Sequence, residues 1–399
     1  MVFKFLTLDD VETEGKTVFL RVDINTPLDP SSKRILDASR IKATVKTIRE
    51  LSGSRLVLGA HQSRPGKYDF TSLELHSRVL QMYLNGNVRF VDDILGEKAM
   101  SAIDSLESGD VLVLNNLRMV PEENVQGPPE EVAATPLVKG LAPKFDLAVN
   151  DAFAASHRSQ PSLVGFGEVM PMVAGRLMEA ELSALNRVLD DPARPCVFVL
   201  GGAKVEDRIP VMRRVLRDGI ADRVLIGGLI RDTFQAAADG PMAPQRDGVL
   251  VEEARGLLDL YGDRIEMPVD VALDVKGERV EIAANRVTDE TNIYDIGLNT
   301  LARYCDQIRR AGTAVAEGPL GMFERRRFDT GTKEILRAMA ECKGFSIVGG
   351  GHLGGMASIL DVESRIGHVS TGGGAMLSLL AGERLPVVEA LERSREKFG

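Results

Sequence analysis

The sequence has few cysteines, no long apolar run and no excess of positive charge, and each absence excludes a class of protein. Its 399 residues include three cysteines, Cys196, Cys305 and Cys342, whose spacing is not that of a metal site. We therefore expect free thiols and a reducing compartment, the cytoplasm, rather than a disulfide-stabilised secreted protein. No apolar stretch approaches the length of a membrane span, and the first residues lack the apolar region of a signal peptide, so we expect neither.

The charge balance argues against nucleic acid as the main partner. The net charge is −9 at pH 7 and the isoelectric point is about 5.3, so the overall field repels polyanions. Small anionic ligands must then be held by local clusters of basic residues. The hydrophobic content of 44% suffices for two cores, and 399 residues exceed the usual size of one domain.

Glycine is scarce in the first part of the chain. Nine of the 39 glycines lie in residues 1–160, and this part instead places basic residues just after apolar, β-rich runs: Arg21, His61, Arg64, Arg118, His157 and Arg158. The later part carries glycine loops at 201–204, 227–228, 317–321, 349–352 and 372–374. Arginine forks bind small rigid anions, whereas glycine loops before helices let backbone N–H groups approach a phosphate chain. The first part thus predicts a site for a small anionic substrate and the second a nucleotide site.

Short apolar runs alternate with helical stretches along the whole chain. Strands are expected at 17–22, 55–60, 111–116, 145–150, 195–202, 222–228, 265–273, 313–318 and 344–350, with a helix such as 40–52 between them. This alternation is typical of parallel sheets covered by helices on both faces, and their ligands bind at the carboxyl ends of the strands. The basic and glycine clusters fall at those ends.

The predicted fold is α/β, with two doubly wound parallel-sheet domains that face each other across a hinged cleft. We expect a substrate domain over residues 1–171, an amphipathic interdomain helix over 172–190 and a nucleotide-binding domain over 191–380. Residues 381–399 are expected to return to the first domain. The segment 121–131 has the composition of an acidic, proline-bearing surface loop.

Familiar nucleotide motifs are incomplete. The Gly15-Lys16-Thr17 tripeptide resembles the end of a P-loop, but the first glycine of that motif is absent and a strand follows. A G-x-G-x-x-G pattern occurs at 349–354 after an apolar run, yet no acidic residue lies about twenty positions later and too little chain remains for a dinucleotide fold. A dinucleotide-dependent oxidoreductase is therefore a remote alternative.

Seven ordered motifs resemble those of phosphoglycerate kinases. They read RVDINTP, AHQSRPG, NDAFAASHRSQPS, LGGAKVEDRI, EGPLGMFE, IVGGGHL and HVSTGGGAMLSLLAGERLP, and together they cover essentially the whole chain. The second, third and sixth look most like the archaeal branch of the family. The resemblance implies reversible phosphoryl transfer between 1,3-bisphosphoglycerate and ADP, giving 3-phosphoglycerate and ATP, in glycolysis and gluconeogenesis. It implies Mg²⁺ delivered with ATP or ADP, a monomer or homodimer, and neither nucleic acid nor membrane as a partner.

Site roles follow from the same resemblance. The residues that bind 3-phosphoglycerate would be Arg21, Asp23, Asn25, Arg40, His61, Arg64, Arg118 and Arg158. The residues that bind the nucleotide would be Gly202, Lys204, Arg208, Gly228, Glu324, Gly350, Gly351, His352 and Leu353. Those that act on the migrating phosphoryl group would be Arg40, Lys204, Gly373 and Gly374.

Each assignment has a plainer alternative. Arg40 taken alone is also compatible with a solvated helix position, Arg21 and Asp23 with a structural ion pair, and His61 and His157 with core histidines. Glu324 would then only cap a helix, and the triple glycine would be a flexible loop.

Six positions depart from the pattern of many relatives. Arg208 replaces lysine, Glu317 asparagine, His352 a magnesium-binding aspartate, Ser63 glycine, Asn115 glutamate and Met119 an aromatic residue. None of these changes removes an expected phosphate cation, so an active enzyme is predicted. The alternative is a catalytically weak relative that binds nucleotide or phosphate.

Overall fold

The computed structural model describes residues 3–84, 86–239, 248–288 and 292–399. The chain divides into two compact units, Val2–Ser183 with Arg384–Gly399, and Ala184–Glu383. We call them the N-terminal and the C-terminal unit. Each contains one six-stranded sheet in which every pair of neighbouring strands is parallel, so the predicted α/β class with two parallel sheets is confirmed. No helix in the described ranges is long and apolar enough to cross a membrane.

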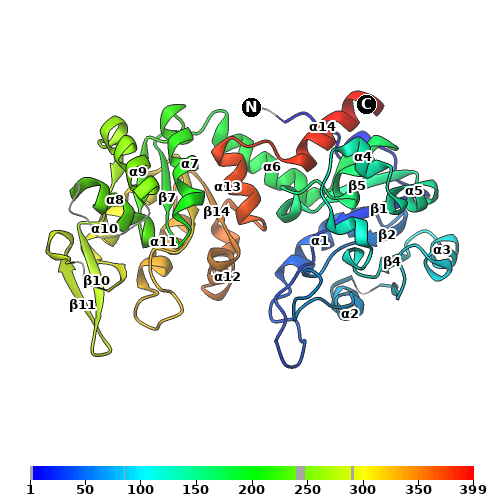
Figure 1. Cartoon of the computed structure of the whole chain (residues 1–399), viewed down its shortest axis with the longest axis horizontal. Coiled ribbons are helices and arrows are strands. Elements are labelled where there is room, and N and C mark those ends of the chain that lie inside the picture. The colour runs from blue at the N-terminus through cyan, green and yellow to red at the C-terminus, as the bar shows by residue number, and fades with distance from the viewer. Residues whose placement is uncertain (1–2, 85, 240–247, 289–291) are drawn as a thin grey trace. The chain divides into compact units, whose positions relative to one another are not determined.

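The sheet of the N-terminal unit has β1 near its centre (Figure 1). Its spatial order is β3 (Val88–Val91), β4 (Val111–Leu114), β2 (Arg55–Gly59), β1 (Thr17–Val22), β5 (Leu147–Asp151) and β6 (Met172–Ala174). The helices of this unit are α1 (Ser39–Glu50), α2 (Glu74–Leu84), α3 (Glu97–Asp104), α4 (Pro129–Ala133), α5 (Pro136–Leu141) and α14 (Pro386–Phe398). The last of these, drawn in red, lies with elements from the other end of the sequence.

The C-terminal unit repeats this plan with β7 and β13 in the middle of its sheet. The order is β15 (His368–Val369), β14 (Phe345–Gly349), β13 (Thr313–Glu317), β7 (Cys196–Leu200), β8 (Arg223–Ile226) and β9 (Ile265–Glu266). A second, antiparallel sheet contains β11 (Glu278–Ala283), β10 (Asp270–Val275) and β12 (Ile293–Ile296). The helices are α7 (Val205–Arg217), α8 (Gly228–Asp239), α9 (Gly248–Tyr261), α10 (Leu298–Arg310), α11 (Thr330–Ala340), α12 (Gly351–Ile359) and α13 (Gly373–Ala381).

Local sequence explains these elements. The central strands are buried along their whole length, as Val, Leu, Ile and Phe runs between helical layers must be. In α10 the buried apolar side chains are Leu301, Tyr304, Cys305 and Ile308, which is the spacing of one helical face. The Tyr304 hydroxyl donates to the Glu266 carbonyl at 2.7 Å, so even this buried phenol is satisfied.

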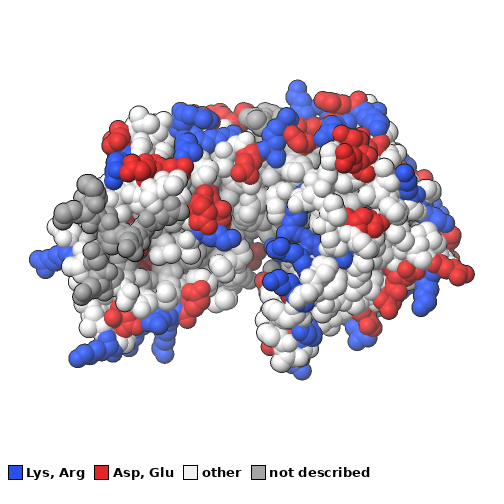
Figure 2. Space-filling model, in the orientation of Figure 1, with Lys and Arg blue, Asp and Glu red and all other residues white. Residues whose placement is uncertain are grey.

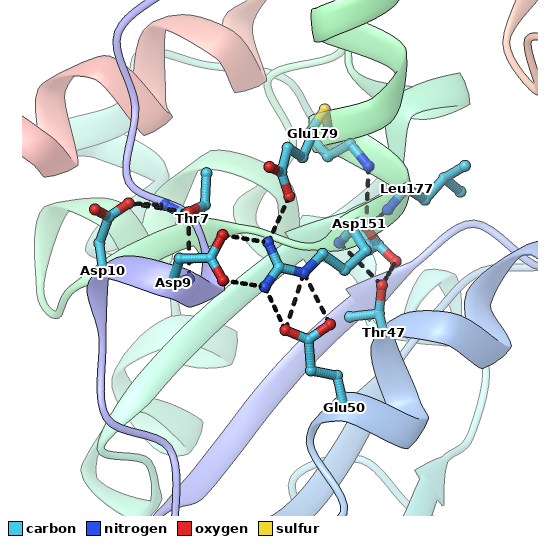
Figure 3. A network of polar contacts seen from close by, with 10 residues as sticks. Thr7, Asp9, Asp10, Thr47, Glu50, Asp151, Leu177 and Glu179 are labelled. Carbon is cyan, nitrogen blue, oxygen red and sulfur yellow. Dashed lines mark hydrogen bonds and ion pairs between the residues drawn. The ribbon is translucent and has the colours of Figure 1, made fainter. Parts of the chain in front are cut away.

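Helix α6 (Arg176–Leu189) carries the chain from one unit into the other. Its first turn is fixed by Asp151, whose Oδ1 accepts from the backbone N–H groups of Leu177 at 2.9 Å and Met178 at 3.0 Å (Figure 3). The Thr47 hydroxyl donates to the other oxygen of Asp151 at 2.6 Å. Because Asp151 is the last residue of β5, this cap ties the start of the helix to the sheet.

Arg176 adds an ionic anchor at the same point, and its partners Asp9, Glu50 and Glu179 are labelled in Figure 3. Its guanidinium donates to Asp9 at 2.9 Å, to Glu50 at 2.8 Å and to Glu179 at 2.7 Å. The three carboxylates belong to the N-terminal 3₁₀ turn, to α1 and to α6 itself. The beginning of α6 is therefore held by segments from three parts of the N-terminal unit.

Two expected elements have different bounds. The helix expected over 172–190 begins at Arg176, because Met172–Ala174 pair with β5 as strand β6. The single strand expected over 265–273 is two strands in different sheets, β9 beside β8 and β10 between β11 and β12. The apolar pattern of residues 172–174 fits a helix or a strand, and that of 265–273 fits one strand or two. The strands with which these residues pair determine the outcome.

Candidate active site

In the N-terminal unit, four adjacent strands deliver the predicted substrate residues to one edge of the sheet. β4, β2, β1 and β5 are neighbours and all parallel, so their carboxyl ends lie together. Arg21 lies in β1 and is followed by Asp23 and Asn25, His61 and Arg64 follow β2, Arg118 follows β4, and Arg158 follows β5. Arg40 is the second residue of α1. Figure 2 shows Lys and Arg side chains gathered on this unit near α1, although the protein is acidic as a whole.

Arg21 is buried at the centre of this group, with 1% of its surface exposed. Its Nε donates to the Ser162 hydroxyl at 2.7 Å, and its Nη2 lies 3.1 Å from His61 Nδ1. Because a guanidinium can only donate, Nδ1 accepts and the proton of the neutral imidazole is on Nε2. Arg21 thus sets the tautomer of His61 from inside the protein.

His61 is neutral at physiological pH. Burial holds its pKa well below the usual value, and the charges of Arg21 and Arg118 act in the same direction. A neutral Nε2–H group still donates a hydrogen bond to an anion. His61 therefore offers a directional donor without a further buried charge.

Asp23 and Arg40 form an ion pair beside the histidine, with 3.0 Å between Oδ1 and Nη1. Burial raises the pKa of Asp23, but Arg40 and the other neighbours lower it more, so that this carboxyl titrates at about 2. The backbone N–H of Asn25 also donates to Asp23 at 3.0 Å, and the Asn25 side-chain oxygen accepts from the Ser63 N–H at 3.0 Å. The loops after β1 and β2 are thereby joined.

Arg118 and Arg158 complete the cluster. Arg118 donates to the Ser63 carbonyl and, at 3.4 Å, to Gln160. Burial lowers the pKa of Arg118 to about 10, and Arg158 and Arg21 act in the same direction, as closely spaced positive charges do. Arg158 Nε donates to His157 Nε2 at 3.2 Å, while Arg64 is exposed.

Glu123 is a site residue that the sequence alone did not indicate. It lies in the segment expected to be an acidic surface loop, yet it is fully buried in the short turn Pro121–Asn124. Its Oε2 accepts from the Ser162 N–H at 2.9 Å, and its Oε1 lies 3.9 Å from Arg21 Nη2. The sequence around Glu123, with a second glutamate and several prolines, has the composition of an exposed loop. The only signal for a buried role is that Glu123 closely follows the turn that contains Arg118.

In the C-terminal unit the glycine loops lie at the corresponding edge. β15, β14, β13, β7 and β8 are adjacent and parallel, and each is followed by a predicted glycine loop. The loops approach one another more closely than side chains allow. A Cβ on Gly201 would lie 2.4 Å from the Pro319 carbonyl oxygen, and one on Gly228 would lie 2.7 Å from the Gly202 nitrogen. Glycine is therefore required at both places.

Four helices begin at these loops, among them α8, which starts at Gly228. Lys204 is the N-cap of α7 and is exposed, α12 starts at Gly351, and α13 starts at Gly373. Added Cβ atoms at Gly351 and Gly374 would meet nothing within 4 Å, so a ligand can approach the backbone there. Helix N-termini with open glycine amides are suited to phosphate groups.

The remaining predicted nucleotide residues lie close to this edge or next to it. Glu324 is exposed in the turn that follows β13, and the N-cap of the next helix, α11, is Asp329, so Glu324 is not a helix cap. The adjacent Phe323 ring lies 5.1 Å from the His352 ring, measured between centroids. Leu353, by contrast, is buried in the core cluster of this unit and can contribute only its backbone.

Arg208 has a different partner from the one expected. Its Nη2 donates to a carboxylate oxygen of Glu317, at the end of β13, and both side chains are buried. Two departures from the pattern of many relatives are therefore in direct contact.

Comparison with known proteins identifies the family of the chain. The family model described as phosphoglycerate kinase matches residues 8–383. The chain belongs to the phosphoglycerate kinase family. It is similar to phosphoglycerate kinase from Methanococcus maripaludis, 46% identical over 410 residues with 98% of this chain and 99% of that protein covered. It is 47% identical over 403 residues to the enzyme from Methanothermobacter thermautotrophicus, with 98% of each covered.

Solved structures agree with this family. A crystal structure of phosphoglycerate kinase from Pyrococcus horikoshii OT3 matches with a TM-score of 0.89 and 44% identity, covering 98% of this chain and 100% of that one. The enzyme from Coxiella burnetii matches with a TM-score of 0.81 and 29% identity, covering 97% and 99%. The resemblance to the archaeal branch, the expected kinase and the expected glycolytic transferase activity are confirmed, and an oxidoreductase is not favoured.

Proposed function

We propose that the N-terminal unit binds 3-phosphoglycerate or 1,3-bisphosphoglycerate and that the C-terminal unit binds ATP or ADP. The observation that carries this division is the separation of the two kinds of anion-binding group. Basic side chains converge on one edge of the first sheet, and open glycine turns converge on one edge of the second. A small phosphorylated acid suits the first arrangement and a nucleotide phosphate chain the second.

Within the N-terminal unit, Asp23 and Asn25 are assigned to the hydroxyl and carboxylate region of the substrate. Four further side chains are assigned to the phosphate that does not migrate: His61, Arg64, Arg118 and Arg158. Arg21 is fully buried and bonded within the protein, so its assigned role is to hold His61 rather than to contact substrate directly.

Within the C-terminal unit, backbone groups are assigned to the nucleotide phosphates. They come from Gly202, Gly228, Gly350, Gly351, His352 and Leu353. Glu324 is assigned to the ribose hydroxyls. Arg208 is assigned to the nucleotide phosphates as a cation that is paired with Glu317 when no ligand is bound.

The reaction requires positive charge and alignment more than proton transfer. In the direction of 1,3-bisphosphoglycerate synthesis, the attacking group is a carboxylate that is already ionised near pH 7, so no general base is needed. Charge on the migrating phosphoryl group must be neutralised. Arg40 and Lys204 are assigned this task, with the backbone of Gly373 and Gly374.

We assign Mg²⁺ to the nucleotide phosphates rather than to a dedicated protein site. Among residues 3–84, 86–239, 248–288 and 292–399, no group of three or more His, Cys, Asp or Glu side chains is placed to hold a metal ion. Mg²⁺ commonly takes its ligands from phosphates and water with one or two carboxylates. The proposal further includes a cytoplasmic protein that acts as a monomer or homodimer, without nucleic acid or membrane partners.

A coupled assay tests the activity. Purified protein with 3-phosphoglycerate, ATP and Mg²⁺ is expected to form 1,3-bisphosphoglycerate, detected through NADH oxidation by added glyceraldehyde-3-phosphate dehydrogenase. Omission of 3-phosphoglycerate is the control for ATP hydrolysis alone. Binding of both ligands without turnover would instead support the catalytically weak relative.

A further inference from the structure

The C-terminal unit contains a buried ion pair at the edge assigned to the nucleotide phosphates. Arg208 lies in the first turn of α7 with 7% of its surface exposed, and Glu317 ends β13 with 4% exposed. Arg208 Nη2 donates to Glu317 Oε2. Arg208 Nε is buried and has no hydrogen-bond partner among the described residues. The guanidinium therefore has donor capacity that the protein does not use.

The Glu317 carboxylate lies against two of the glycine turns. A Cβ added to Gly350 would be 2.9 Å from Glu317 Oε1, and one added to Gly373 would be 3.1 Å from the same oxygen. A Cβ on Gly349 would be 3.1 Å from Glu317 Cγ. A negatively charged group of the protein thus lies at the turns that begin α12 and α13, where the nucleotide phosphates are assigned.

Arg208, the partner of Glu317, lies beside a third glycine turn, the one that follows β7. A Cβ on Gly202 would be 3.4 Å from Arg208 Nη2, so the guanidinium lies beside the loop that follows β7. Lys204 is two residues further along that loop. Arg208 and Glu317 together bridge the turns after β7, β14 and β15.

We propose that Glu317 is an affinity-determining residue, an internal anion that competes with nucleotide phosphate for Arg208 and for the glycine turns. Nucleotide binding then requires that Glu317 release Arg208 to the phosphates. This inference rests on the assignment of the nucleotide to these loops. It makes Glu317 a residue that weakens the binding of ADP and ATP, in contrast to the cations around it.

Electrostatics gives the competition a pH dependence. Burial raises the pKa of Glu317 to about 7, an effect that Arg208 and Lys204 oppose and Asp207 supports. The adjoining elements also carry Glu206 in the first turn of α7, His352 on α12 and His368 on β15. An incoming phosphate chain adds negative charge, so it favours the protonated, neutral form of Glu317. Nucleotide affinity should therefore fall as pH rises through about 7 and Glu317 ionises.

A purely structural pair would behave differently. Removing one partner of a buried ion pair leaves the other unpaired and usually costs stability. If Glu317 only holds α7 against β13, its replacement should loosen the loops and weaken nucleotide binding at every pH. Tighter binding after the loss of a side chain is not a result that a structural role produces.

The test compares Glu317→Gln with the wild type by isothermal titration calorimetry, using ADP without Mg²⁺ at pH 6 and pH 8. With a competing group that titrates near 7, wild-type affinity should fall about tenfold more than that of Glu317→Gln between these values. At pH 8 the variant should bind ADP about tenfold more tightly than the wild type. ADP titrates alike in both samples, so its own ionisation cancels in the comparison.

Two further variants make the result decisive. Glu341→Gln removes one carboxylate from an exposed pair with Arg309 in the same unit and should leave ADP binding unchanged. Glu317→Asp keeps the charge and should keep the pH dependence. Thermal melting followed by circular dichroism shows whether each variant is folded. If Glu317→Gln is unfolded, the inference is tested by Glu317→Asp, whose affinity for ADP should depend on pH as that of the wild type does.

The outcomes separate this inference from the proposed function. Equal or weaker ADP binding by a folded Glu317→Gln at pH 8, with an unaltered pH dependence, overturns the inference while wild-type turnover continues. A pH-independent affinity in both the wild type and Glu317→Asp overturns it too. Failure of the wild type itself to bind ADP or to phosphorylate 3-phosphoglycerate would remove the proposed function instead.

Discussion

Individual residues in the N-terminal site differ in how much of their charge is committed to the protein. Arg21 and Arg118 are buried and donate to protein groups, so they act as a fixed framework. Arg64 is exposed, and Arg40 keeps 32% of its side chain accessible while it pairs with Asp23. The accessible cations are the ones free to follow a phosphate, and this difference leads to different mutational signatures.

Arg40→Ala and Lys204→Ala should each reduce turnover more than binding. Both cations are assigned to the migrating phosphoryl group, and a contact made mainly in the transition state affects rate rather than ground-state affinity. A preorganised electrostatic donor is commonly worth about 10²–10³ in rate, so each variant should lose about that factor in kcat. Affinities for 3-phosphoglycerate and ATP should stay within roughly tenfold of the wild type. Steady-state kinetics in the coupled assay measures both.

Arg64→Ala is the matched comparison. Its guanidinium is assigned to the phosphate that stays in place, so the expected effect is a raised KM for 3-phosphoglycerate with a smaller change in kcat. Near-normal kcat in Arg40→Ala together with a large rise in KM would show that Arg40 binds the stationary part of the substrate.

Ser63 illustrates the effect of backbone conformation at a single residue. It has φ of +58° and its hydroxyl hydrogen-bonds Asp69 at 2.5 Å. Ser63→Ala keeps the left-handed conformation but loses that bond, whereas Ser63→Gly loses the bond and relieves the conformational cost of about 1 kcal/mol. We therefore expect the glycine variant to be the more stable of the two by roughly 1 kcal/mol in urea unfolding. Equal stabilities would mean that the loop relaxes around either residue.

At the scale of elements, the sequence was most informative where apolar runs and turn signals agree. The strands that end before Asp23, His61 and Lys204 lie close to their expected positions, because their buried runs are followed by polar or glycine-containing turns. Parallel packing then brings the predicted residues of each unit to one edge. The two bounds that differ, at 172–174 and 265–273, lie at strands for which pairing outweighs local pattern: β6 and β9 are at the edges of the parallel sheets, and β10 is the middle strand of the antiparallel sheet.

Long-range polar pairs are what the sequence could not supply. Glu123 meets Ser162 across 39 positions, and Arg208 meets Glu317 across 109. Glu123 lies beside the exposed Asn124, and Glu317 ends a buried strand, so the local sequence of neither glutamate indicates its partner. Whether each glutamate is buried, and which residue it contacts, depends on how the turns pack in three dimensions. The periodicity of the sequence contains no information about that packing.

The N-terminal cap of helix α6, Asp151, provides a test of stability at the scale of an element. Asp151 is fully buried, and burial raises its pKa from 3.8 to about 6, although Thr47 and the helix N–H groups lower it. A carboxyl with a raised folded-state pKa stabilises the fold fully below its unfolded-state pKa, and this contribution is lost as pH rises through about 6. An amide has no such titration.

Asp151→Asn should accordingly gain on the wild type as pH increases. The difference between their unfolding free energies should shift by about 2–3 kcal/mol in favour of the variant between pH 4 and pH 7.5, in thermal or urea unfolding. Asp151→Ala, which removes the cap altogether, should be destabilised by about 2 kcal/mol. A constant difference between the Asn variant and wild type across this range would show that the pKa of Asp151 is the same in the folded and the unfolded protein.

On the scale of the whole molecule, the chain passes between the two units twice. It leaves the N-terminal unit within α6 and returns after Glu383, and α14 is anchored there by the Met172 N–H, which donates to the Ser394 hydroxyl at 2.7 Å. The proposed substrates bind to different units, and a phosphoryl group can pass between them only over a short distance in line. We therefore expect rotation near residues 160–190, which contain the crossing within α6, and near residues 366–375, which precede the second crossing after Glu383.

Small-angle X-ray scattering tests that motion. With 3-phosphoglycerate and a non-hydrolysable ATP analogue together, the radius of gyration should be smaller than with either ligand alone, because Arg40 and Lys204 then share one phosphoryl group. Lys204→Ala at saturating ligand removes one side of this bridge and should show a smaller contraction. Single-ligand samples of the wild type control for ordering within one unit. An unchanged radius in a sample that turns over normally with ATP would mean that the two sites are already within reaction distance before both ligands bind.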